Sequence, residues 1–73
     1  MNKRVGLVGR IVTFYYENYK GVFSKRRVRV HDFLYASTEW HEEPQFLMYA
    51  YDYDKMAFRY FAVRDITDLK VDM

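Results

Sequence analysis

Alternating apolar and polar residues divide the chain into short extended segments. β-branched and aromatic residues, which suit a pleated and half-buried surface, fill these segments. They are residues 10–17 (RIVTFYYE), 22–33 (VFSKRRVRVHDF), 46–52 (FLMYAYD) and 57–63 (AFRYFAV). The final RDITDLKVDM predicts a short helical turn and then an edge strand, where charged residues alternate with Leu69 and Val71. The pattern therefore predicts five strands, and no window shows a convincing helical period.

Turn residues separate these strands at short intervals. NYKG, with Asn18 and Gly21, predicts a reversal between the first two strands, and YDKM predicts another between the third and fourth. Residues 36–45 (ASTEWHEEPQ) contain the only proline and are polar apart from Trp40, so they predict a loop. Periodicity alone leaves open whether residues 33–37 end a strand or form a helical turn. We expect an all-β fold, either a small antiparallel barrel or a strongly bent sheet.

The length and the absence of cysteine limit how such a fold is stabilised. We expect one domain over residues 1–73, because cores divide only in much longer chains. A domain of this size buries only about 60% of the surface of its unfolded chain, and disulfides are excluded. Aromatic residues form 21% of the chain. Since each ring buries roughly 150–250 Å², we expect rings to fill the core.

Nothing in the composition indicates export or membrane insertion. The first residues, MNKRVGLVGR, lack the apolar stretch of a signal peptide. No window approaches the roughly 18 apolar residues that span a bilayer. We expect a cytoplasmic protein with no membrane partner.

Charge is divided unevenly between the halves of the chain. Residues 1–35 hold eight lysines and arginines against Glu17 and Asp32, whereas residues 36–73 hold four against eight acids. Two explanations stay open. Either the halves pair with each other across the sheet, or the first half forms a basic face for an anionic partner.

The segment KRRVR is the basis for the second explanation. In a strand, Val28 and Val30 point to one face, which we expect to be buried, and Arg27, Arg29 and His31 point to the other. Lysine and arginine side by side on that face are destabilising unless acids across the sheet or an outside anion offset them.

Aromatic residues near this basic strand suggest what the anion is. Rings that face outward would let bases stack while guanidinium groups bind phosphates, as on platforms for single-stranded nucleic acid. The alternative is that the rings face the core. The residues concerned are Tyr49, Tyr51 and Tyr60.

Catalytic and metal-binding signals are weak in this chain. His41 lies beside Glu42 and Glu43, and His31 precedes it by ten residues, but no close-spaced ligand pair typical of zinc is present. The glycine elbow of serine hydrolases and the phosphate-binding GxxxxGK[ST] pattern are both absent. General acid–base chemistry by Glu42 and Glu43 stays open as an alternative, but we predict that the protein is not an enzyme and uses no metal or cofactor.

A longer pattern runs from Tyr16 to Leu69. It comprises an aromatic strand ending at Tyr16, a turn with Gly21, the RRVRV segment, FLMYAYD, RYFAV and the isoleucine of RDI. In order and spacing it resembles the WYL domain, a module found mostly in bacterial and phage transcription regulators. The resemblance implies an SH3-like or Sm-like barrel that senses nucleic acid or nucleotide-type ligands.

The chain departs from the WYL pattern in its polar positions more than in its apolar scaffold. Arg59 and either Arg27 or Arg26 keep the places of the family's basic residues, and Arg64 lies one residue from another. Val30 replaces a proline, and Phe46, Leu47 and Met48 replace the Trp-Tyr-Leu triad that gives the family its name. Ala62 and Asp65 replace arginines.

Together these patterns predict a non-enzymatic regulatory module that binds nucleic acid or a nucleotide on a basic strand face. The alternative is a protein-interaction module, such as a small phage-type inhibitor or regulator that docks on a host protein or associates with itself. The predicted ligand-binding residues are Arg27, Arg29, Arg59, Arg64, Trp40 and His41.

Overall fold

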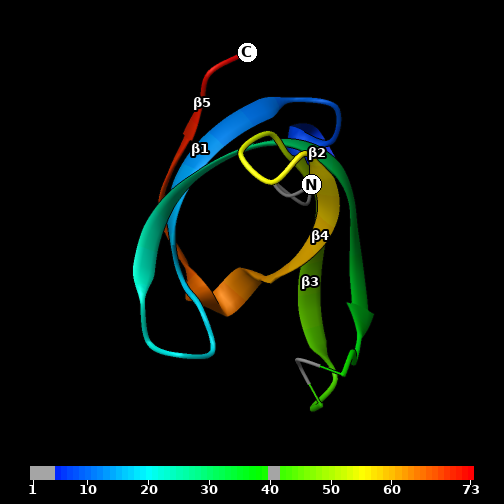
Figure 1. Cartoon of the computed structure of the whole chain (residues 1–73). Helices are drawn as coiled ribbons and strands as arrows, with labels where there is room; N and C mark the ends of the chain where they lie inside the picture. The colour runs from blue at the N-terminus through cyan, green and yellow to red at the C-terminus, as the bar shows by residue number, and fades with distance from the viewer. Residues whose placement is uncertain (1–4, 40–41) are drawn as a thin grey trace.

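The computed structural model describes residues 5–39 and 42–73, which form one bent antiparallel sheet (Figure 1). The strands lie in the order β4-β3-β2-β1-β5. Within the described residues the sheet is not closed, because β4 and β5 are its two edges. The all-β prediction of a small barrel or bent sheet is therefore confirmed. The elements are η1 (Val5–Leu7), β1 (Ile11–Glu17), β2 (Phe23–Ala36), β3 (Gln45–Asp52), β4 (Ala57–Ala62), η2 (Val63–Asp65) and β5 (Ile66–Val71).

The two tight turns form where the sequence predicts them. In the first, the Asn18 side chain accepts hydrogen bonds from the backbone N–H groups of Lys20 and Val22, at 2.9 and 3.1 Å. Gly21 takes a φ of 78°, which a glycine adopts without strain. The open question at residues 33–37 is also answered, because β2 remains extended through Ala36.

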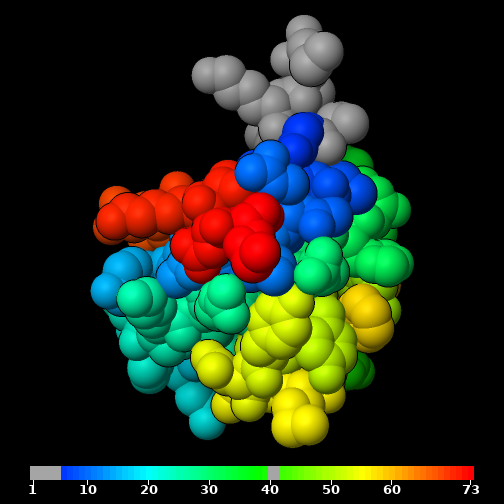
Figure 2. Space-filling model, turned by 90° about the horizontal axis from the view of Figure 1, so that it is seen from above, coloured from blue at the N-terminus to red at the C-terminus, as the bar shows by residue number. Residues whose placement is uncertain are grey.

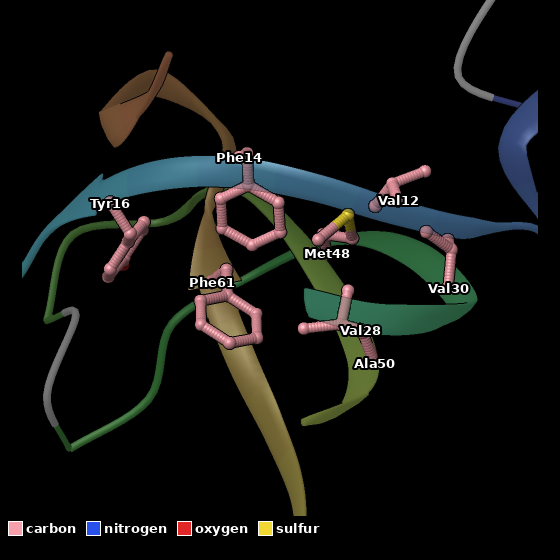
Figure 3. Packing of buried hydrophobic residues seen from close by; sticks show 8 residues of the cluster. All are labelled: Val12, Phe14, Tyr16, Val28, Val30, Met48, Ala50 and Phe61. Carbon is pink, nitrogen blue, oxygen red and sulfur yellow. The ribbon is translucent and has the colours of Figure 1, made fainter. Parts of the chain in front are cut away.

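The core lies on the concave face of the sheet, where the rings of β1 and β4 meet (Figure 3). Phe14, Tyr16 and Phe61 form a triangle of edge-to-face contacts, with ring centroids 5.1–6.3 Å apart. Val28 and Val30 complete the floor and are buried, as predicted for the valine face. The expectation that aromatic rings fill the core is therefore confirmed for some of the aromatic residues.

A β-bulge at His31 changes which face the rest of β2 presents. Val30 pairs with Ala50 and Asp32 pairs with Tyr49, so His31 is an extra residue on β2. An extra residue reverses the alternation of side chains beyond it. Phe33, an odd-numbered position like Arg29, therefore turns inward and packs against the core.

The edge strand β5 closes onto β1 through a second bulge. The register shifts between Thr13 and Tyr15, and Asp68 has a φ of 54°, a conformation that aspartate tolerates better than most residues. Beyond the strand, Ile11 donates to and accepts from the backbone of Met73, at 2.9 and 3.2 Å. Figure 2 shows these last residues in red against the blue start of the chain.

One ion pair is buried inside the sheet. The Arg26 guanidinium contacts Asp52 at 3.0 Å, and their side chains are 11% and 0% exposed. The other Asp52 oxygen accepts the N–H groups of Asp54 and Lys55, which fixes the turn between β3 and β4. Asp52 therefore links the core to the second hairpin.

Tyr16 joins β1 to the end of β4. Its hydroxyl oxygen accepts the backbone N–H of Ala62 at 2.9 Å. Burial, chiefly, raises the pKa of the Tyr16 phenol, and the nearby Asp65 raises it further. The ring is thus held in the core as a neutral phenol.

We expect Tyr16 to contribute to alkaline unfolding. Because its folded pKa lies above the unfolded value near 10, the unfolded chain loses the proton first, and stability falls as the pH rises past about 10. Tyr16→Phe should cost about 1–3 kcal/mol at neutral pH, since the Ala62 N–H loses its acceptor, but should reduce this alkaline fall. Urea unfolding at a series of pH values measures both effects, with the exposed Tyr35→Phe as control. An alkaline fall identical to that of the wild type would contradict this role.

No helix among the described residues is long and apolar enough to cross a membrane.

Candidate functional site

The convex face of β2, β3 and β4 carries a continuous layer of rings. Register places Tyr51 opposite Phe58 and Tyr49 opposite Tyr60, all on the face away from the core. Phe58 stacks on Tyr49 with centroids 5.1 Å apart and planes inclined by 14°, and Tyr60 lies 4.8 Å from Tyr49. The aromatic layer, as we name it, consists of His31, Tyr49, Tyr51, Tyr53, Phe58 and Tyr60.

Several rings of this layer remain open to solvent. Phe58 is 49% exposed and Tyr60 is 45% exposed, while Tyr49 and Tyr51 are half-buried. Monomeric proteins usually cover such a set of large side chains, so this exposed cluster is a candidate interaction surface. The sequence left open whether Tyr49, Tyr51 and Tyr60 face the core, and the structure places all three on the opposite face.

Two of the predicted arginines border the aromatic layer. Arg29 donates from Nε to the Tyr53 hydroxyl at 3.3 Å and from Nη1 to the Gly9 carbonyl at 3.0 Å. Arg27 lies over the Tyr53 ring, with its guanidinium carbon 5.8 Å from the centroid. Tyr53 is thus the residue that connects the basic strand to the rings.

Acids offset part of the basic strand. Arg27 forms an ion pair with Asp72 at 3.4 Å, and Asp72 also accepts a hydrogen bond from the Thr13 hydroxyl. The Thr13 bond, followed by Arg27, lowers the pKa of the Asp72 carboxyl. Both ion pairs found among the described residues, Arg26–Asp52 and Arg27–Asp72, join the basic half of the chain to the acidic half. Cross-sheet pairing therefore accounts for Arg26 and Arg27 but not for Arg29.

A shallow groove of about 750 Å³ continues the basic strand toward the edge strand β5. Lys25, Arg27 and Lys70 line it together with three acids. The acids are Asp54, Asp68 and Asp72. This groove carries mixed charge, whereas Arg29, on the side of the aromatic layer, has only neutral partners among the described residues.

The other predicted site residues do not join Arg27 and Arg29. Arg59 pairs in register with the buried Ala50, so its side chain leaves the sheet on the concave face. It lines a different pocket. Arg64 lines a small hollow beside Tyr35 and Phe46. Trp40 and His41, also predicted to bind the ligand, lie outside the described residues.

Two residues of this region, Tyr53 and Phe58, were missed at the level of sequence, and Arg26 was named only as an alternative to Arg27. Tyr53 contacts Arg27 and Arg29, Phe58 stacks on Tyr49, and Arg26 forms the buried pair with Asp52. Register with Tyr51 would have placed Phe58 outside, had the hairpin register been known. No three residues of the kinds that bind metals come together in the described part of the chain.

Comparison with known proteins gives this geometry no family name. No model of a known protein family matches the chain, and no curated protein matches its sequence. Any function of this chain must therefore be inferred from the site itself.

Proposed function

We propose that this protein is a non-enzymatic module that binds single-stranded nucleic acid on the convex face of β2, β3 and β4. The observation that carries the proposal is the exposed aromatic layer directly beside Arg27 and Arg29. Every base can stack on an aromatic ring, and guanidinium groups bind the phosphates along the strand. Such a surface therefore binds single strands with little sequence preference. The resemblance to WYL domains points the same way and is part of the proposal.

The rings and the arginines of this surface contact different parts of the nucleic acid. Phe58 and Tyr60 are the most exposed phenylalanine and tyrosine rings of the layer, so they offer ring surface to a base. Arg29 has donors beyond its bonds to Tyr53 and Gly9, because a guanidinium carries five N–H groups. Paired bases of a duplex would be unable to reach the rings, which is why a single strand is favoured.

We expect a salt titration to distinguish the contribution of base stacking to affinity from the contribution of phosphate contacts. The probe is a labelled oligothymidine or oligouridine of about 12 nucleotides, within the usual site sizes, followed by fluorescence anisotropy from about 50 to 200 mM salt. Phe58→Ala should weaken binding about 5- to 100-fold at every salt concentration, as expected for one lost stack. Arg29→Gln should lower the slope of log K against log salt by about 0.7, the value for one phosphate on a single strand.

Matched controls lie elsewhere on the surface. Tyr35→Ala removes a ring that is 64% exposed, and Arg64→Gln removes an arginine from the hollow beside it. Both should leave affinity and salt slope unchanged. Absence of binding by the wild type, or equal losses in the controls, would reject the proposal.

A protein-interaction module is the second candidate, and the edge strand β4 favours it. β4 has one partner strand, no bulge in its pairing with β3, and Arg59 as its only charged residue, whereas β5 is bulged and carries Asp68 and Lys70. Unprotected edges accept a further strand from another chain. Binding through such an edge would tolerate salt, so the same titration distinguishes the two candidates.

A further inference from the structure

A second pocket opens on the concave side of the sheet, between the β1–β2 turn and β4. Its volume is about 540 Å³. Tyr16, Arg26 and Phe61 reach it from the core, and Arg59 reaches it from the edge strand. Among the described residues, the lining is Tyr16, Asn18, Tyr19, Arg26, Thr38, Ala57, Phe58, Arg59, Tyr60 and Phe61.

Two polar groups in this pocket, the Tyr16 hydroxyl and the Arg59 guanidinium, are donors with no acceptor among the described residues. The Tyr16 hydroxyl oxygen already accepts the Ala62 N–H, so its own hydrogen is available, and no acceptor for it is found among residues 5–39 and 42–73. Burial raises the pKa of this phenol, which keeps the hydrogen in place at neutral pH. Tyr16 can therefore donate one hydrogen bond into the pocket.

The two charged residues among the described lining residues are both arginines. Arg26 is balanced by Asp52 and donates from Nε to Ser24 at 2.9 Å, so its position is fixed. Arg59 is exposed, and neither ion pair of the described residues includes it. Both guanidinium groups line the same pocket as the Tyr16 ring, and their charges oppose the rise in the Tyr16 pKa. The positive charge of Arg59 is therefore the one left to be neutralised.

We propose that this pocket binds a small organic anion, whose carboxylate or phosphate group is held by Arg59 and the Tyr16 hydroxyl. The two groups that hold the anion lie on the concave side of the sheet, whereas Phe58 and Tyr60 of the edge strand belong to the aromatic layer and also border this pocket. The proposal uses Arg59 and Tyr16, so it does not rest on nucleic-acid binding. Charge-assisted bonds from a guanidinium to such oxygens are among the strongest in proteins.

The walls indicate the rest of the ligand. The Phe61 ring forms part of the lining, with the Arg26 guanidinium carbon 5.9 Å from its centroid. Pockets of a few hundred Å³ with apolar walls and a few convergent polar groups are typical of small-molecule sites, and they occur at the mouths of barrels. A flat ring that carries one anionic group fits these walls better than an inorganic ion.

Phenyl phosphate, benzoate and inorganic phosphate are the probes that test this site. Isothermal calorimetry measures affinity, and amide shifts of Ala62 and Phe61 in ¹⁵N-labelled protein report the location. We expect both aromatic anions to bind at one site and inorganic phosphate to bind more weakly. Phenyl phosphate tighter than benzoate assigns the head group as phosphate, and the reverse assigns it as carboxylate.

Arg59→Gln should weaken binding of the aromatic anions about tenfold or more, as expected for a lost charge-assisted bond. Arg59→Lys, which keeps the charge, should retain part of the affinity. Arg64→Gln is the matched control and should change affinity less than about twofold. Each variant alters an exposed side chain, so loss of the fold is not expected to confuse the result.

Three results would overturn the proposal. They are no saturable binding of either aromatic anion, equal effects of Arg59→Gln and Arg64→Gln, and shifts confined to the convex face. Binding of inorganic phosphate as tight as that of phenyl phosphate would contradict the role of the aromatic walls.

Discussion

Phe61→Ala is expected to cost about 3–5 kcal/mol, the usual range for a fully buried phenylalanine. Phe61 is 1% exposed and contacts both Phe14 and Tyr16 edge to face, so its removal leaves a cavity bordered by two rings. A domain of this length has a total stability of only about 4–11 kcal/mol. The variant should therefore be marginally folded at room temperature, which urea unfolding followed by circular dichroism would show.

A graded series keeps this prediction measurable even if the alanine variant does not fold. Phe61→Leu retains much of the volume and should cost less than Phe61→Ala. Phe58→Ala, on the same strand but 49% exposed, is the matched control and should change stability by well under half as much. Equal losses at positions 58 and 61 would show that β4 does not contribute to the core as described.

Asp52→Asn should be the other severe substitution. The change keeps the shape of the side chain but leaves the Arg26 guanidinium, 11% exposed, without its counter-charge. Removal of one partner of a buried pair typically costs about 3–5 kcal/mol. The loss appears as a lower midpoint in urea, and hydrogen exchange should quicken at Asp54 and Lys55, whose N–H groups bond to Asp52.

The double variant Arg26→Met with Asp52→Asn separates the charge from the geometry. Because the uncompensated charge is removed, much of the lost stability should return. Asp54→Asn serves as an exposed control and should have little effect. If the double variant is no more stable than Asp52→Asn alone, the charge of Arg26 is not the cause of the loss.

The strands and turns were predictable because each uses a strong local signal. The aromatic and β-branched residues of β1 favour a strand, and the asparagine and glycine of the first turn favour a reversal. The alternation of Val28 and Val30 places both on one face. The folded structure retains all three local preferences. The predicted polar face of β2, with Arg27 and Arg29, follows from the same alternation.

The assembly of the site was less predictable, since it depends on register. The bulge at His31 reverses the faces of β2, and nothing in RVRVHDF marks that residue as the extra one. Arg59 was grouped with Arg27 and Arg29 because it keeps a basic position of the WYL pattern, but pairing with Ala50 directs it to the concave face. Tyr53 lies in a turn, where a sequence gives no direction for a side chain, and it is the residue that joins rings to arginines.

The pairing of β5 with β1 also has a consequence for how the chain folds. The two hairpins are local and can form early. In contrast, β1 lacks its second partner until β5 docks, and β5 begins at Ile66, 49 residues after the end of β1. Contacts between distant segments slow folding, because the loop must close before they contribute. Until Ile66–Val71 docks, β1 is itself an open edge, and on a ribosome this state lasts until β5 has been synthesised. The charged residues of KRRVR and the turn-forming NYKG beside β1 would then protect the nascent hairpin from pairing with other chains.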